Sequence, residues 1–127
     1  MRYRFSKAFT LIEILIVVVI LGILAAIVIP QFTKASEDAQ GGNVQSQLST
    51  IRNQIELYRV RNNGQYPFSA TALVWTPLVA PDYLRAAPVN PRTNSSVVAA
   101  GTDHTSGATT NGWIWNNTTK TIYASYF

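Results

Sequence analysis

The sequence predicts an α+β protein in which one long N-terminal helix packs on a small antiparallel sheet of about three strands. Three observations predict this class. Residues 9–30 form an almost uncharged apolar run, and a helical repeat of apolar residues follows over residues 44–58. The chain then closes with short segments rich in β-branched and aromatic residues, which are typical of strands. We expect the first half of the helix to span a membrane and the second half to be amphipathic.

The apolar run is long enough to cross a bilayer. Residues 9–29 carry no basic side chain and a single acidic one, Glu13. As a helix these 21 residues reach about 31 Å, which matches a hydrocarbon core of about 30 Å. A cleaved secretory signal has a shorter apolar region followed by small residues, so the run does not fit one. A plain single-pass anchor fits the length but leaves Glu13 unexplained, because an acid at mid-bilayer costs about 2.5 to 3.5 kcal/mol.

Positive charge is concentrated ahead of the apolar run. Arg2, Arg4 and Lys7 precede every acidic residue of a chain whose formal net charge is +4. Short basic flanks stay in the cytoplasm, so we expect the N-terminus inside and residues 31–127 outside. The later basic residues are scattered among acids, and we therefore expect no nucleic-acid partner. The absence of cysteine excludes disulfides and thiolate chemistry.

The second half of the predicted helix carries one apolar stripe. Its members are spaced four, three, four and three residues apart: Val44, Leu48, Ile51, Ile55 and Tyr58. The sequence Asn62-Asn63-Gly64 supplies a stop, so we predict one helix over residues 9–62 with a soft point at Gly41-Gly42. The stripe covers barely two heptads, which favours a helix that faces its own domain over a coiled coil.

The rest of the chain is predicted to be a loop-rich region closed by strands. Prolines and aromatic residues over residues 66–91 leave room for a single short helix that starts after Ser69. Three strands are predicted, over residues 95–100, 113–116 and 121–126. We expect the last two strands to form a hairpin through residues 117–120.

The residues around Glu13 resemble a processing motif. The string Lys7-Ala8-Phe9-Thr10-Leu11-Ile12-Glu13, behind a short basic leader, is similar to the cleavage and methylation motif of type IV prepilins and type II secretion pseudopilins. The resemblance implies that a membrane peptidase cleaves between Ala8 and Phe9 and that the new amine of Phe9 is methylated. Ala8 departs from the family, which nearly always has glycine there.

The same resemblance implies assembly roles for Glu13, Gly22 and Pro30. The carboxylate of Glu13 would neutralise the amine of Phe9 on a neighbouring subunit, because such a pair attracts strongly at low dielectric. Glycine and proline at the positions of Gly22 and Pro30 bound a segment that loses helicity in the filament, and both residues weaken helices. A tolerated kink near the membrane exit is the alternative interpretation.

These interpretations divide the chain into a leader over residues 1–8, a membrane and polymerisation helix over 9–30 and an exported pilin-like domain over 31–127. We expect a non-enzymatic structural subunit of a type II secretion pseudopilus. It would sit in the inner membrane with its C-terminal domain in the periplasm, and polymerise there into a filament with its own copies and other pseudopilins. The resemblance also implies as partners the prepilin peptidase, the inner-membrane secretion platform and the lipid bilayer.

Two alternatives stay open at this point. One is a type IV pilin used for adhesion, motility or DNA uptake. The other is a membrane-tethered binding module that does not polymerise and uses Trp113 and Trp115 as its ligand face. We expect at least one of these tryptophans to face the core.

The C-terminal part resembles the major pseudopilin of type II secretion in the order of its loops. The similar segments are residues 61–67, 83–84 and 88–91. That subunit binds calcium through clustered carboxylates in its C-terminal loops, whereas Asn90 and Arg92 here depart from its acidic and aromatic pattern. The loop over residues 101–112 offers Asp103 and His104 without a second acid. We expect no active site and no cofactor, with calcium as the alternative.

Overall fold

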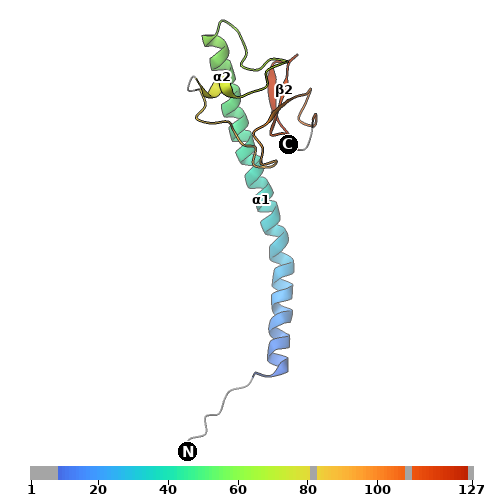
Figure 1. The fold of residues 1–127 in the computed structure, drawn as a ribbon. Helices are drawn as coiled ribbons and strands as arrows, with labels where there is room; N and C mark the ends of the chain where they lie inside the picture. Colours follow the sequence, from blue (N-terminus) through green and yellow to red (C-terminus); the bar gives the residue numbers. More distant parts are fainter. Residues whose placement is uncertain (1–8, 81–82, 108–109, 126–127) are drawn as a thin grey trace, which may run out of the picture. The chain divides into compact units, whose positions relative to one another are not determined.

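A computed structural model describes residues 9–80, 83–107 and 110–125 (Figure 1). Contacts divide the chain into two compact units, with the boundary between Glu37 and Asp38. The elements in chain order are α1 Leu11–Arg61, α2 Thr76–Val79, β1 Val98–Ala100, β2 Trp113–Asn116 and β3 Thr121–Ala124. The predicted class, a long apolar helix with a small three-stranded sheet, is confirmed.

Helix α1 ends where the sequence predicts its stop. Asn63 and Gly64 have positive φ angles of 53° and 84°, a conformation that glycine and asparagine adopt more readily than other residues. The Gly64 N–H donates to the Arg59 carbonyl at 2.8 Å, and the Asn62 side-chain amide donates to the Tyr58 carbonyl at 2.9 Å. The last carbonyls of the helix therefore find partners beyond its end.

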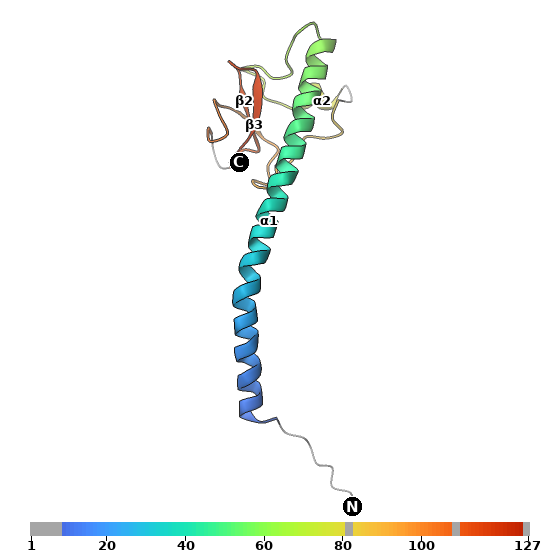
Figure 2. The same ribbon diagram turned by 180° about the vertical axis from the view of Figure 1, so that it is seen from behind.

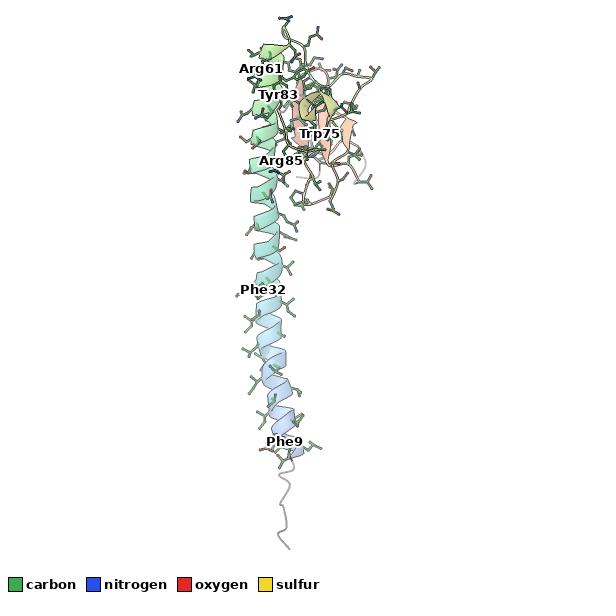
Figure 3. All side chains as sticks on the ribbon, turned by 60° about the vertical axis from the view of Figure 1, so that its left-hand side comes forward. Phe9, Phe32, Arg61, Trp75, Tyr83 and Arg85 are labelled. Carbon is green, nitrogen blue, oxygen red and sulfur yellow. The ribbon has the colours of Figure 1, made fainter. Side chains whose placement is uncertain are left out.

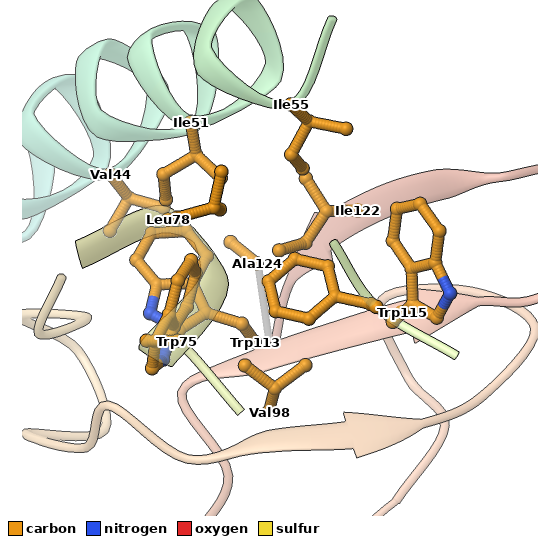
Figure 4. Packing of buried hydrophobic residues seen from close by; sticks show 11 residues of the cluster. Val44, Ile51, Ile55, Trp75, Leu78, Val98, Trp113, Trp115, Ile122 and Ala124 are labelled. Carbon is orange, nitrogen blue, oxygen red and sulfur yellow. The ribbon is translucent and has the colours of Figure 1, made fainter. Parts of the chain in front are cut away.

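In the second unit, one face of α1 packs on the sheet (Figures 2 and 4). Val44, Ile51 and Ile55 are buried, while Leu48 and Tyr58 are partly buried against the same core. The apolar stripe therefore faces its own domain, as predicted. Arg52 also links the helix to the sheet by hydrogen bonds, because its guanidinium donates to the Ile122 carbonyl of β3 at 3.0 and 3.3 Å.

Aromatic side chains fill the other side of this core. Trp113 and Trp115 are 0% and 1% exposed, so both face inward and neither offers a ligand face. Phe68 contacts both Trp75 and Trp115, with ring centroids 5.2 and 5.3 Å apart. Such rings contribute a large apolar area together with favourable edge contacts. The alternative of a binding module that uses Trp113 and Trp115 is therefore wrong in its ligand face.

The sheet has the order β1-β2-β3, but it is mixed and not antiparallel throughout. Strands β2 and β3 form the predicted antiparallel hairpin, whereas β1 and β2 pair in parallel, with Val98 opposite Trp113. The connection over residues 101–112 explains the difference. A parallel neighbour needs a connection of about a dozen residues, and this loop is long enough to return the chain to the same end of the sheet. Strand β3 ends at Ala124, and Tyr126, its predicted end, lies outside the described residues.

The short helix lies later than predicted. Ser69 begins a turn in which its hydroxyl accepts from the Ala72 N–H at 3.1 Å, but no helix follows. Helix α2 begins at Thr76 instead and has a proline in its first turn, where the missing N–H costs nothing. It brings Leu78, which is 0% exposed, into the core. The position of this helix is therefore determined by the burial of Leu78 and not by a capping role of Ser69.

Candidate functional site

Glu13 forms a reciprocal cap at the start of α1. Its Oε2 atom accepts from the Thr10 N–H and from the Thr10 hydroxyl, both at 2.8 Å, and the Glu13 N–H donates to the Thr10 hydroxyl at 3.3 Å. This is a capping box, which satisfies N–H groups that have no partner within the helix. Its sequence signature, Thr-x-x-Glu, is present at residues 10–13, although the cap was not among the predicted features. The other carboxylate oxygen, Oε1, has no hydrogen bond within the described chain.

The helix that follows this cap exposes its apolar surface on all sides (Figure 3). Every side chain over residues 11–29 is exposed, and Phe9 and Phe32 are 83% and 72% exposed. Within the described residues, α1 is the one helix that is long and apolar enough to cross a membrane, by length and composition. A helix that is apolar all round is stable only when lipid or other helices cover it.

Gly22 and Pro30 lie inside the helix, and α1 remains helical through both. A β-carbon added at Gly22 would meet no atom within 4 Å, so packing within this chain does not require glycine there. Pro30 cannot donate a backbone hydrogen bond, and nearby the Thr33 hydroxyl donates to the Ile29 carbonyl at 3.2 Å. The predicted soft point at residues 41–42 is also helical.

The predicted cleavage site is only partly within the described chain. Phe9 is the first described residue and precedes the capping box directly. Ala8 and the rest of the leader over residues 1–8 lie outside the described residues. The structure therefore places Phe9 and Glu13 close together at one end of α1, while Gly22 and Pro30 lie farther along it.

The loop around Asp103 is closed by its own hydrogen bonds. The Asp103 Oδ1 atom accepts from the Thr105 N–H at 2.9 Å, the Thr105 hydroxyl at 2.7 Å and the Ser106 hydroxyl at 3.0 Å. These bonds, the one from the Thr105 hydroxyl above all, lower the pKa of Asp103 below its usual value of 3.8. His104 is exposed. Among the described residues, no three His, Cys, Asp or Glu side chains are close enough to share a metal ion.

Asn90 lies at a junction that the sequence did not indicate. It is 0% exposed, and its Nδ2 atom donates to the carbonyls of Gly112 at 2.8 Å and Ser125 at 3.3 Å. Its Oδ1 atom accepts from the Arg92 N–H at 2.9 Å. The Asn90 backbone N–H also donates to the Ser95 carbonyl at 2.9 Å. Because the two carbonyl partners lie 22 and 35 residues away in sequence, no local pattern signals this role.

Comparison with known families identifies the N-terminal segment. Residues 3–29 match a family model described as the prokaryotic N-terminal methylation motif. This match covers the capping box and most of the exposed apolar helix. No solved structure matches the chain.

Curated relatives extend the likeness into the second unit. Two proteins named type II secretion system core protein G, from Klebsiella michiganensis and Pseudomonas aeruginosa, are 31% and 36% identical over 102 residues, which cover 72% of this chain and 71% of each relative. A protein of the same name from Aeromonas hydrophila is 36% identical over 85 residues, which cover 65% of this chain and 59% of that relative. The type IV narrow pilus major component of Thermus thermophilus is 39% identical over 59 residues, 46% of this chain and 51% of that protein.

Proposed function

This chain belongs to the family of the type II secretion system core protein G, the major pseudopilin, and from that premise we propose that it is a membrane-anchored structural subunit of a secretion pseudopilus. The observation that carries the proposal is the uncovered apolar helix that begins at Leu11 and has Glu13 in its first turn. In a lone membrane anchor Glu13 would serve only as the helix cap, and its charge would stay unpaired at the membrane, which is costly. In a subunit that leaves the bilayer and stacks against its copies, the acid can also pair with a charge on a neighbour.

Maturation is the first step of this function. A membrane peptidase cleaves between Ala8 and Phe9 on the cytoplasmic side, and the free amine of Phe9 is then methylated. The basic residues of the leader keep that end in the cytoplasm, so the domain over residues 31–127 is in the periplasm. The protein is a structural subunit and not an enzyme. Its partners are the peptidase, the lipid bilayer, the inner-membrane secretion platform and other pseudopilins.

Glu13 provides the assembly contact. Its Oε2 atom is used in the capping box, while Oε1 has no partner within the described chain. Cleavage leaves the Thr10 N–H in place, so the cap survives and holds the carboxylate at the end of the helix. The Phe9 amine of an axially offset neighbour can then approach Oε1. In a water-free surrounding an unpaired charge is costly, so this pair selects one register between subunits.

Gly22 and Pro30 allow the helix to change when it exchanges lipid for neighbouring subunits. Glycine weakens a helix by about 1 kcal/mol, and proline removes one helical hydrogen bond. The free space around Gly22 agrees with a role in helix flexibility, because no contact within the chain requires its small size. The segment between Gly22 and Pro30 loses helicity in the filament.

The experiment separates the charge of Glu13 from its capping role. Glu13→Gln keeps an oxygen that can accept from Thr10, since glutamine also completes a capping box, but it removes the charge. We expect this variant to insert and to be cleaved like the wild type and to form few or no filaments. Thr10→Ala removes the hydroxyl of the cap and keeps the charge, so its filaments should remain. Glu37→Gln removes a charge from the same helix outside the apolar run and serves as the control.

Filament yield is measured in sheared fractions and by electron microscopy after overexpression, beside a processing blot for every variant. Wild-type filament levels from correctly processed Glu13→Gln would refute the pairing role. The likeness to the Thermus pilus component favours a second candidate, a type IV pilus subunit. Filaments that persist without the secretion assembly ATPase and disappear without the pilus ATPase would decide for that candidate.

A further inference from the structure

We propose that the buried side-chain amide of Asn90 holds the segments of the C-terminal region together by hydrogen bonds. The region therefore needs no calcium ion for its stability. The resemblance to the major pseudopilin implies a calcium ion in the C-terminal loops. Calcium takes about six to eight oxygen ligands, with carboxylates prominent among them. The donor set among the described residues does not fit that requirement, and Asn90 joins the segments by hydrogen bonds instead.

The first argument is the chemistry at Asn90. Two main-chain carbonyls, those of Gly112 and Ser125, converge on its Nδ2 atom at 2.8 and 3.3 Å. Converging oxygens suit either a cation or an N–H₂ group, and the amide supplies one donor for each oxygen. The amide nitrogen therefore takes the place where a cation would contact these carbonyls.

The second argument is that Asn90 has its main hydrogen-bonding groups satisfied within the chain. Its side-chain oxygen accepts from the Arg92 N–H at 2.9 Å, and its backbone N–H donates to Ser95 at 2.9 Å. The residue is 0% exposed, so water does not compete for these bonds. Three segments, residues 90–95, the start of β2 and the end of β3, are thereby held at one buried point.

The third argument concerns the acid that remains in the loop. Asp103 is the only acid of residues 101–112, and its Oδ1 atom already accepts three hydrogen bonds from Thr105 and Ser106. The Ser106 hydroxyl in turn accepts from the N–H groups of Thr102 and Asp103 at 3.1 and 3.2 Å. Three His, Cys, Asp or Glu side chains do not gather anywhere in the described part of the chain. Residues 102–106 thus bond to one another, and the loop carries one acid where calcium requires several.

The first test needs no substitution. The intrinsic fluorescence of the buried Trp75, Trp113 and Trp115 reports melting of the second unit in the full chain, purified in detergent. We expect the same melting temperature with a chelator and with millimolar calcium. A ligand at about 100 times its Kd raises the melting temperature of a domain of this size by about 10 °C or more, so a rise of that order would overturn the proposal.

The second test addresses the amide itself. Asn90→Asp turns a donor into an acceptor that faces two carbonyl oxygens, and it buries a charge. Asn94→Asp adds the same charge to the same loop at an exposed position and is the matched control. In chelator, we expect Asn90→Asp to melt about 10 °C or more below Asn94→Asp. Equal melting temperatures would refute the role of Asn90. If Asn90→Asp does not fold at all, the calcium response of the wild type decides the proposal by itself.

Discussion

Replacing Gly112 with alanine should strongly destabilise the second unit, although it adds only one methyl group. A β-carbon at Gly112 would overlap the main-chain oxygen of Ser95 and lie 2.7 Å from its carbonyl carbon. Both are backbone atoms, so no side chain can rotate away. The site is also held by hydrogen bonds. Gly112 donates to Val97 at 3.0 Å and accepts from Ser125 at 3.1 Å and from Asn90 at 2.8 Å.

The cost follows from these contacts. Residues 95–97 must move away from Gly112, which stretches the hydrogen bonds on both sides of it. Overpacking a tight site costs about 1–3 kcal/mol, and each hydrogen bond contributes about 1 kcal/mol. We expect the free energy of unfolding to fall by about 2–4 kcal/mol. Since 1 kcal/mol shifts the melting temperature by about 4–8 °C in a domain of this size, the drop should be about 10 °C or more.

The assay is thermal unfolding of the full chain in detergent, followed by tryptophan fluorescence, with Gly42→Ala as the matched control. Gly42 lies inside α1, and a β-carbon there meets no atom within 4 Å. Alanine favours a helix interior over glycine by about 1 kcal/mol, so Gly42→Ala should melt slightly higher than the wild type. A Gly112→Ala protein that melts with the wild type would show that the close contact with Ser95 does not constrain this junction.

Two further predictions concern the N-terminus of the mature chain and the loop around Asp103. Mass spectrometry of protein extracted from membranes of its own host should give a chain that begins at Phe9 with one added methyl group; an intact Met1 start would contradict the maturation. The carboxyl of Asp103 should titrate below 3.8, because hydrogen bonds from Thr105 lower its pKa. Its contribution to loop stability is therefore present above that pH and is lost as the pH falls through the lowered pKa. The NMR shift of the Thr105 amide measures the midpoint, and a midpoint at or above 3.8 would refute this.

Structural features that depend on residues close together in the sequence could be predicted. The stripe from Val44 to Tyr58 follows the helical repeat, and the stop at Asn63 and Gly64 follows from the conformations these residues accept. The β2–β3 hairpin was predicted for the same reason, since its turn joins adjacent segments. The capping box of Glu13 is equally local, and its Thr-x-x-Glu signature at residues 10–13 would have predicted it.

The sequence alone was enough to predict an apolar spanning helix with one acid at its start, an amphipathic continuation and a closing hairpin, because each depends on residues a few positions apart. Only the tertiary structure decided that β1 pairs in parallel with β2, that α2 begins at Thr76 and that Asn90 lies at a buried junction. These three features depend on partners brought from distant parts of the chain, and their energies come from burial and long-range hydrogen bonds. The conformational propensities of Ser69 and Asn90 could not reveal such partners. These propensities are small compared with the free energy gained when the hydrophobic core packs.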